Sequence, residues 1–168
     1  MENAFRQSLY MDTFKGCNLK EPKGGRKMAQ ADEKKTVLFI CTHNSARSQM
    51  AEGLLRAVYN DRYEAHSAGA EPSTVSPYAV KVMKEIGIDI AKQNSKSVEQ
   101  FRGMSFEFVV TVCDGTREAC SFFPVGKNYL HKGFEDPSRF STDMETLAAF
   151  RRVRDEIKDW IVKTFGQN

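Results

Sequence analysis

The sequence predicts an α/β fold in which helices flank a parallel sheet. Short apolar stretches alternate along the chain with longer segments in which apolar residues recur every three or four positions. Alternation of this kind is typical of parallel strands that are joined by helical crossovers. The chain has 168 residues, of which 40% are apolar and 28% charged, so it is large enough for one globular domain with its own core.

Four apolar segments are predicted to be strands. The first is apolar at nearly every position, as expected for a central strand that is covered on both faces. The third is equally apolar, whereas the fourth is the shortest. The predicted strands are residues 36–40, 63–68, 106–112 and 127–130.

Helices are predicted between these strands and after the last of them. The second helix begins at Ser76 and Pro77, which suit a cap and a first turn, and it stops at Gly87. In the last helix, Thr142 and Glu145 form a capping box ahead of apolar residues at spacings of three and four. The predicted helices are residues 48–59, 76–86, a short one near 97–101 and the long one that follows residue 142.

Residues 1–35 are polar and lack helical or strand periodicity, so we expect a flexible N-terminal extension in which Cys17 has no role. Residues 36–168 are expected to form a single α/β catalytic domain.

The charge of the chain is unevenly distributed. Residues 1–35 carry 8 Lys and Arg against 5 Asp and Glu, whereas the remaining residues carry 17 of each. The predicted domain thus has no excess of basic charge, which argues against nucleic acid as a partner. The absence of a membrane-length apolar run and of a signal peptide predicts no membrane association and a cytoplasmic location.

One stretch combines an anion site with a nucleophile. An apolar strand ends at Cys41, and a helix begins near Arg47 after a short loop. Backbone N–H groups of the loop, the free N–H groups at the helix start and the Arg47 guanidinium can all bind a tetrahedral oxyanion. In such positive surroundings the Cys41 thiolate is favoured over the thiol and can act as a nucleophile. The predicted oxyanion-binding residues are Thr42, His43, Asn44, Ser45, Ala46, Arg47 and Ser48.

Three further residues are candidates for chemistry at the same edge of the sheet. Asp136 precedes a proline after the fourth strand and could be the general acid that protonates a departing oxygen. Cys113 ends the third strand, so it emerges at the same edge as Cys41, and adjacent strands lie about 5 Å apart. Cys120 follows across a polar segment that contains Gly115, which would permit this segment to bend.

The Cys41-x5-Arg47-Ser48 arrangement resembles the low-molecular-weight protein tyrosine phosphatase family. Cys41, Asn44, Arg47 and Ser48 match the phosphate loop of that family position by position. The resemblance implies that Asn44 holds a strained loop backbone, that Ser48 stabilises the thiolate and that Asp136 protonates the leaving group. It also implies a three-layer fold with four parallel strands in the order 2-1-3-4.

With its three thiols, the chain is similar to the thioredoxin-coupled arsenate reductases that are built on this scaffold. The implied mechanism is a relay: Cys41 attacks arsenate, Cys113 forms a disulfide with Cys41 as arsenite leaves, and Cys120 then takes over the bond to Cys113. Thioredoxin, reduced by NADPH through its reductase, would reduce this last disulfide, so no bound cofactor is implied. Arsenic detoxification would be the function, with weak phosphatase activity as a by-product.

No metal site is expected. A zinc site needs four ligands, and Cys113 and Cys120 have no second pair of ligands at a suitable spacing. Some members of the family bind potassium beside the loop, where Asn44 and Glu52 would suit such a site. Lys96, however, stands where an acidic ligand would be expected.

Two other functions are compatible with the loop. A low-molecular-weight protein tyrosine phosphatase would share Cys41, Arg47 and Asp136, but no tyrosine pair follows the Asp-Pro sequence, and Cys113 and Cys120 would be idle. A non-enzymatic oxyanion-binding or redox-sensing protein would keep the loop without needing Asp136. We favour the arsenate reductase because of the thiol pair, and we expect a monomer.

Overall fold

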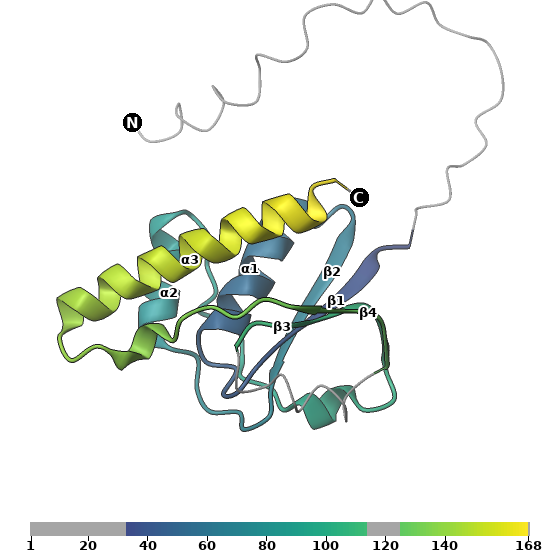
Figure 1. The fold of residues 1–168 in the computed structure, drawn as a ribbon, viewed down its shortest axis with the longest axis horizontal. Coiled ribbons are helices and arrows are strands. Elements are labelled where there is room, and N and C mark those ends of the chain that lie inside the picture. The colour runs from purple at the N-terminus through teal and green to yellow at the C-terminus, as the bar shows by residue number, and fades with distance from the viewer. Residues whose placement is uncertain (1–32, 114–124, 168) are drawn as a thin grey trace, which may run out of the picture. The chain divides into compact units, whose positions relative to one another are not determined.

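The computed structural model describes residues 33–113 and 125–167 (Figure 1). The elements are β1 (Lys35–Cys41), α1 (Arg47–Tyr59), β2 (Tyr63–Gly69), α2 (Pro77–Glu85), the 3₁₀ helix η1 (Val98–Phe101), β3 (Ser105–Thr111), β4 (Val125–His131), the 3₁₀ helix η4 (Pro137–Arg139) and α3 (Asp143–Phe165). Residues 1–32 of the predicted flexible extension (1–35), Cys17 among them, lie outside the described residues. Cys120 lies outside them as well. Within the described part, no helix combines the length and the apolar character of a membrane span.

The four strands form one parallel sheet in the order β2-β1-β3-β4, which confirms the predicted topology. β1 lies in the middle, and its last residue, Cys41, pairs with Gly69 at the end of β2. β4 is longer than the predicted 127–130, because Val125 and His131 also pair with β3, opposite Ser105 and Thr111. β1 also begins one residue earlier than predicted.

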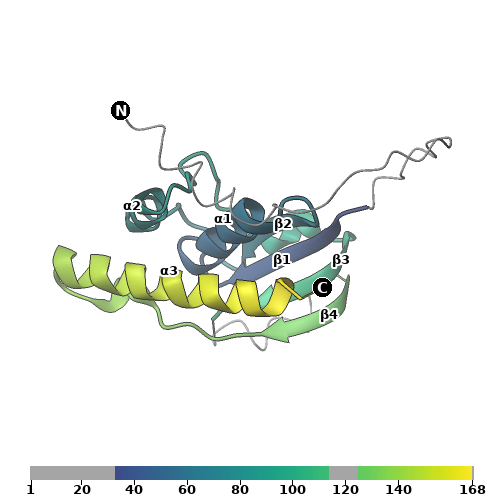
Figure 2. The same cartoon turned by 90° about the horizontal axis from the view of Figure 1, so that it is seen from above.

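Alternate residues of β1 point to two separate cores. Val37, Phe39 and Cys41 face the larger core, which the buried stripes of α1, α2 and α3 complete (Figure 2). Leu38 and Ile40 face a smaller core on the opposite side, where η1 covers the sheet. Because both faces are covered, every side chain from residue 37 to 40 is fully buried, as the unbroken apolar run of this strand predicts.

The α3 helix closes the larger core with aromatic residues near its C-terminal end. Phe165 is fully buried, and its ring packs edge-on against the rings of Phe39, Tyr63 and Phe108. Trp160 contacts the Phe165 ring at a centroid distance of 5.8 Å. The long helix therefore ties three strands together from one face of the sheet.

The segment after β2 packs tightly against the loop that follows β1. A Cβ atom on Gly69 would lie 2.7 Å from the backbone nitrogen of Asn44 and 2.8 Å from the carbonyl oxygen of Thr42. The backbone N–H groups of Glu71 and Ser73 donate to the carbonyls of Thr42 and His43, at 2.8 and 3.1 Å. A glycine at the end of β2 is thus required for the two backbones to approach so closely.

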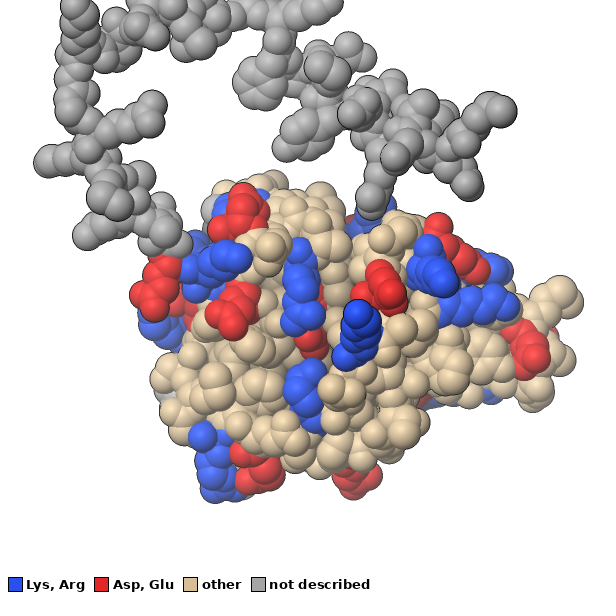
Figure 3. Space-filling model, turned by 180° about the vertical axis from the view of Figure 1, so that it is seen from behind, with Lys and Arg blue, Asp and Glu red and all other residues tan. Residues whose placement is uncertain are grey.

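The face of the molecule shown in Figure 3 carries basic and acidic side chains that are interspersed, without a large area of a single sign. This distribution agrees with the equal numbers of acidic and basic residues beyond position 35. The surface of this face therefore offers no extended basic track of the kind that binds a nucleic-acid backbone.

We expect Phe165→Ala to lower the free energy of unfolding by about 3–5 kcal/mol, because it removes a buried ring that contacts four other aromatic rings. Urea denaturation measures this change. Met144→Ala in the same helix is the control, since Met144 is 80% exposed, and it should change stability by less than about 0.5 kcal/mol. Equal stabilities of the two variants would contradict this account of the core.

We expect Gly69→Ala to lower the free energy of unfolding by about 1–3 kcal/mol, because the added methyl group meets backbone atoms that cannot rotate away. Hydrogen exchange should also accelerate at the backbone amides of residues 42–46. Ala70→Ser, at the exposed neighbouring position, is the control. Unchanged exchange in Gly69→Ala would show that the loop does not depend on this contact.

Candidate active site

The loop between β1 and α1 turns all of its carbonyl groups outward. The carbonyls of Thr42, His43 and Ser45 accept hydrogen bonds from backbone N–H groups of residues 71, 73 and 76. The Asn44 carbonyl accepts from the Gln49 side chain at 3.1 Å, and the Ala46 carbonyl accepts from the first turn of α1. With the carbonyls occupied in this way, the loop leaves its N–H groups for the concave side, which is the arrangement of an anion-binding nest.

The start of α1 adds donors to the same site. The helix begins at Arg47, and the preceding residue, Ala46, provides no side-chain cap. The first N–H groups of a helix have no partner within it, and the helix dipole places partial positive charge there. An oxyanion bound in the loop can supply the missing acceptor.

The Cys41 sulfur lies at the floor of this loop and receives hydrogen bonds from it. The Asn44 N–H donates to the sulfur at 3.2 Å, and the Ser48 hydroxyl oxygen lies 2.9 Å away. Cys41 is 3% exposed, so a reagent reaches its sulfur only through the pocket that the loop surrounds. The backbone N–H of Asn44 points its hydrogen at the sulfur, and the Ser48 hydroxyl is close enough to do the same, so both groups can stabilise negative charge that develops there.

Asn44 adopts the left-handed backbone conformation, with φ of 46°. Its fully buried side chain donates to the hydroxyl oxygens of Ser48 and Ser67, at 2.8 and 2.9 Å. Its Oδ1 accepts from Gln49 and from the backbone of Lys96. Asparagine tolerates this conformation better than most residues, and these bonds offset the remaining strain.

Arg47 and Asp136 meet above the loop. The Arg47 Nη2 lies 2.9 Å from the Asp136 Oδ2, and its Nη1 donates to the Phe134 carbonyl at 3.1 Å. The other oxygen of Asp136 accepts from the Ser138 N–H, which caps η4. Phe134 is buried against Trp160 and so anchors the segment that carries Asp136 to the core.

These groups line one open pocket of about 300 Å³. Its lining residues are Cys41, His43, Ser45, Ala46, Arg47, Ser73, Asp136 and Ser138. The pocket thus brings together the predicted nucleophile, the predicted anion-binding guanidinium and the predicted general acid. Ser73 and Ser138 were not predicted, because a lone serine in a polar segment has no spacing that marks it.

A second cavity, of about 360 Å³, adjoins the first and shares Ser45 and Ser138 with it. Tyr78 and Phe140 contribute aromatic side chains to this cavity. The Tyr78 hydroxyl donates to the Asp143 carboxylate, and this hydrogen bond raises the pKa of Tyr78 above its usual value. An organic group attached to a bound oxyanion would have room beside these rings.

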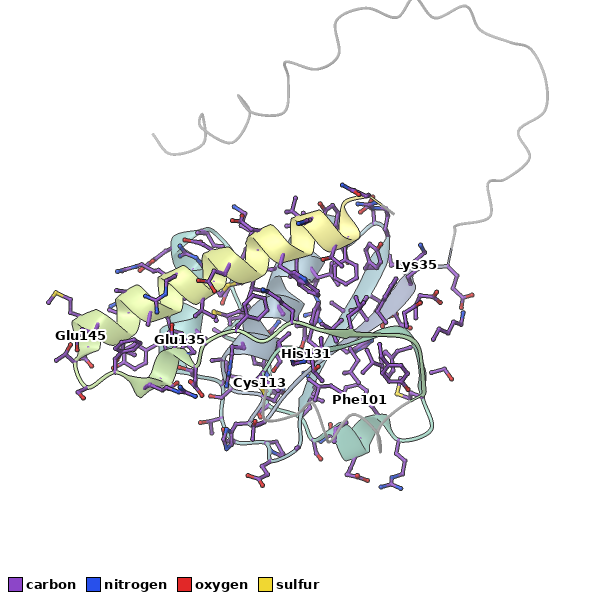
Figure 4. All side chains as sticks on the ribbon, viewed as in Figure 1. Lys35, Phe101, Cys113, His131, Glu135 and Glu145 are labelled. Atoms are coloured by element: carbon purple, nitrogen blue, oxygen red, sulfur yellow. The ribbon has the colours of Figure 1, made fainter. Side chains whose placement is uncertain are left out.

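Cys113 lies next to the loop, as the position of its strand predicts. β3 ends at Thr111, which pairs with Ile40, and the backbone N–H of Val112 still bonds to the Ile40 carbonyl, so Cys113 lies two residues beyond the last pair of these strands. Its sulfur is 3.5 Å from the Thr42 hydroxyl oxygen, and the side chain is 2% exposed. Figure 4 labels Cys113 among the side chains of the molecule. Cys120, the third predicted thiol, lies outside the described residues.

Within residues 33–113 and 125–167, no three His, Cys, Asp or Glu side chains are arranged to hold a metal ion. Beside the loop, the Lys96 ammonium lies 3.4 Å from the Glu52 carboxylate. A lysine cation thus lies beside Glu52, while the backbone N–H of the same residue contacts Asn44.

Comparison with known proteins places this fold and loop in a family. Residues 36–167 match the family described as low molecular weight phosphotyrosine protein phosphatase. An arsenate reductase of Halalkalibacterium halodurans is 47% identical over 135 residues, covering 80% of this chain and 96% of that protein. An arsenate reductase of Bacillus subtilis is 43% identical over 126 residues, covering 74% of this chain and 91% of that protein.

Solved structures show the same relationship. A structure described as an arsenate reductase in the phosphate binding state aligns with a TM-score of 0.66 at 31% identity, covering 79% of this chain and 98% of that one. A low molecular weight protein tyrosine phosphatase from T. tengcongensis aligns with a TM-score of 0.65 at 28% identity, covering 80% of this chain and all of that one. The matched residues contain the whole Cys41-to-Ser48 loop, Cys113 and Asp136, and the chain belongs to the low molecular weight phosphotyrosine protein phosphatase family.

Proposed function

We propose that this protein is an arsenate reductase that converts arsenate to arsenite through three cysteines and is regenerated by thioredoxin. The observation that carries the proposal is the position of Cys113, buried beside the loop that holds Cys41. A phosphatase needs one thiol at this site, whereas a reductase needs a second thiol within reach of the first. The names of the relatives support the same activity.

Arsenate and phosphate are tetrahedral oxyanions, so both fit a loop of inward N–H groups with a guanidinium above it. In the first step the Cys41 thiolate attacks arsenic, and an As–S bond replaces an As–O bond. Asp136 supplies the proton with which the departing oxygen leaves as water. The contact with Arg47 holds this carboxyl group at the mouth of the pocket, and a bound oxyanion that takes over the guanidinium releases the carboxyl group to carry the proton.

In the second step the Cys113 thiolate attacks the Cys41 sulfur. The electron pair of the As–S bond passes to arsenic, which is reduced from As(V) to As(III) and leaves as arsenite. The two cysteines are oxidised to a disulfide, so the two electrons balance. A disulfide needs Cα atoms about 4.4–6.8 Å apart, and adjacent strands that end side by side supply a separation of this order.

In the third step Cys120 attacks Cys113, and the disulfide moves from Cys41–Cys113 to Cys113–Cys120. Thioredoxin then reduces this bond with its own pair of thiols. The burial of Cys113 supports the need for a further thiol, since a protein reductant has little access to a sulfur that is 2% exposed. No bound cofactor takes part in this scheme.

A second candidate, a tyrosine phosphatase, has one observation in its favour. The cavity next to the oxyanion pocket is lined by Tyr78 and Phe140, and an aryl group could pack there. A phosphatase would use Cys41, Arg47 and Asp136 in the same roles, but its activity would not require Cys113. The two functions therefore differ in which thiols they require.

We expect Cys41→Ser, Cys113→Ser and Cys120→Ser each to abolish arsenite production in the presence of thioredoxin, its reductase and NADPH. The relay passes through every one of these sulfurs, so no step can be skipped. Arsenite production, followed with NADPH consumption, is the measurement, and Cys17→Ser is the matched control that should keep full activity. Reduction that survives the loss of Cys113 or Cys120 would reject the relay. Brisk hydrolysis of a phosphotyrosine ester by Cys113→Ser, without arsenate reduction by the unmodified protein, would favour the phosphatase.

We expect Asp136→Asn to lower kcat for arsenate reduction by about 10²–10⁴-fold, because the amide cannot supply the proton that the departing oxygen needs. Steady-state kinetics measures this loss. Glu135→Gln is a matched control at the neighbouring position, where the carboxylate pairs with Arg152 on the surface. Equal activities of the two variants would remove Asp136 from the mechanism.

A further inference from the structure

The second cavity continues from the oxyanion pocket and is lined mainly by hydroxyl groups. It has a volume of about 360 Å³ and shares Ser45 and Ser138 with the first pocket. Ser45 belongs to the loop that follows Cys41, and the backbone N–H of Ser138 donates to the Asp136 carboxylate at 3.0 Å. A group attached to a bound oxyanion can therefore pass between these two serines, beside the proposed general acid, and enter the cavity.

The start of α2 forms one wall of this cavity. Ser76 stands at the N-cap position, where a serine usually accepts a hydrogen bond from the first turn, but its side chain makes no such bond. Its hydroxyl is therefore left for a ligand. Its backbone N–H donates to the Ser45 carbonyl at 2.9 Å, which fixes this wall against the active-site loop. The ring of Tyr78, on the same turn, packs against the fully buried Phe150 at a centroid distance of 5.5 Å.

The opposite wall is the segment that joins η4 to α3. Two of its hydroxyl groups are already engaged, since Thr142 accepts from the Glu145 N–H and Thr146 donates to the Phe140 carbonyl. Phe140 is 37% exposed and presents its ring to the cavity. Ser141, between this ring and the cap of α3, also lines the cavity and is exposed.

Several hydroxyl groups of the lining have no hydrogen-bond partner for their side chains among residues 33–113 and 125–167. They are Ser45, Thr74, Ser76, Ser138 and Ser141. A hydroxyl group both donates and accepts, so this set can bond to the hydroxyl groups of a ligand whichever way these point. The rings of Tyr78 and Phe140 add apolar faces against which the C–H groups of such a ligand can pack.

The charge of the lining excludes several classes of ligand. Among the described residues that form it, Asp143 alone carries a charge, and its Oδ1 accepts from the Tyr78 hydroxyl. Its Oδ2 can accept from a hydroxyl group of a ligand. A second phosphate or a carboxylate on the ligand would meet this like charge without a cation to pair with. A neutral group that is rich in hydroxyls therefore fits the cavity best.

We infer that the second cavity binds the organic part of a phosphate monoester whose alcohol is a neutral polyhydroxy compound, such as a monosaccharide. In this complex the phosphate lies in the loop against Arg47, and the ligand hydroxyls bond to Ser76, Ser141 and Asp143. Such an ester occupies the loop in place of arsenate. An aryl ester would displace water from the same serines without replacing its hydrogen bonds. The inference rests on the oxyanion pocket of the proposed function but not on its thiol relay.

The test measures how strongly phosphate esters protect Cys41 of the full chain from iodoacetamide, with mass spectrometry of the Cys41 peptide as the readout. Glucose 1-phosphate and cyclohexyl phosphate share the phosphate group and the ring size, but only the first carries hydroxyl groups. We expect glucose 1-phosphate to bind about 5- to 30-fold more tightly, because a few further hydrogen bonds form. Glucuronic acid 1-phosphate, which adds a carboxylate, should bind more weakly than glucose 1-phosphate.

A double variant, Ser76→Ala with Ser141→Ala, tests the residues themselves. It should weaken the binding of glucose 1-phosphate by about 3- to 10-fold, because two ligand hydroxyls lose their partners. Its dissociation constant for inorganic phosphate should be unchanged, since Arg47 and the loop N–H groups remain in place. Ser105→Ala is the control, because Ser105 is exposed at the start of β3, at the far end of that strand from the active site.

Four outcomes would overturn the inference: equal binding of glucose 1-phosphate and cyclohexyl phosphate, equal binding of phenyl phosphate, tighter binding of the glucuronic acid ester, or an unchanged preference in the double variant. Each of these, with inorganic phosphate still protecting Cys41, would count against the cavity alone. A failure of inorganic phosphate and of all the esters to protect Cys41 would count against the oxyanion pocket, and with it against the proposed function.

Discussion

The outward orientation of the carbonyl groups in the loop of residues 42–46 is the constraint on which the active site depends. A peptide group has a donor at one end and an acceptor at the other, so a loop can present N–H groups to an anion only if its carbonyls find partners elsewhere. Residues 71, 73 and 76 supply three of these partners from the segment after β2. The anion site therefore forms only where the connection from β1 to α1 lies beside the connection from β2 to α2, which supplies donors for its carbonyl groups.

Asn44 joins this backbone arrangement to the chemistry of the sulfur. Its left-handed conformation turns the chain so that its own N–H reaches the Cys41 sulfur at 3.2 Å. Its side chain connects the Ser48 hydroxyl with the buried group of Glu52 and Lys96 through Ser67. The shape of the loop and the surroundings of the nucleophilic sulfur thus depend on the same residue.

The difference between a phosphatase and a reductase on this scaffold lies at the end of β3. The parallel register brings the residue after Val112 beside the first residues of the loop, whatever its type. In the proposed relay, a thiol at that point is the second sulfur that attacks the adduct of Cys41 with the oxyanion. The shared fold of the two kinds of relatives agrees with this view.

The sequence alone was sufficient for the fold class, for most strand and helix limits to within one residue and for the grouping of Cys41, Arg47 and Asp136 at one edge of the sheet. These features follow from local periodicity and from the rule that parallel strands end at a common edge. Asp136 and Arg47 were predicted as separate parts, but their direct pairing at 2.9 Å came only from the structure.

Only the tertiary structure could decide which partners occupy the loop carbonyls of residues 42, 43 and 45, why Gly69 must lack a side chain and how Lys96 reaches Glu52. Those contacts join residues that are 25 or more positions apart, mainly through backbone groups that every residue type possesses. A sequence pattern records side chains and their local period, and it carries no signal for which distant N–H group will meet which carbonyl. That choice is made by the packing of the strands and helices, which brings the two connections together.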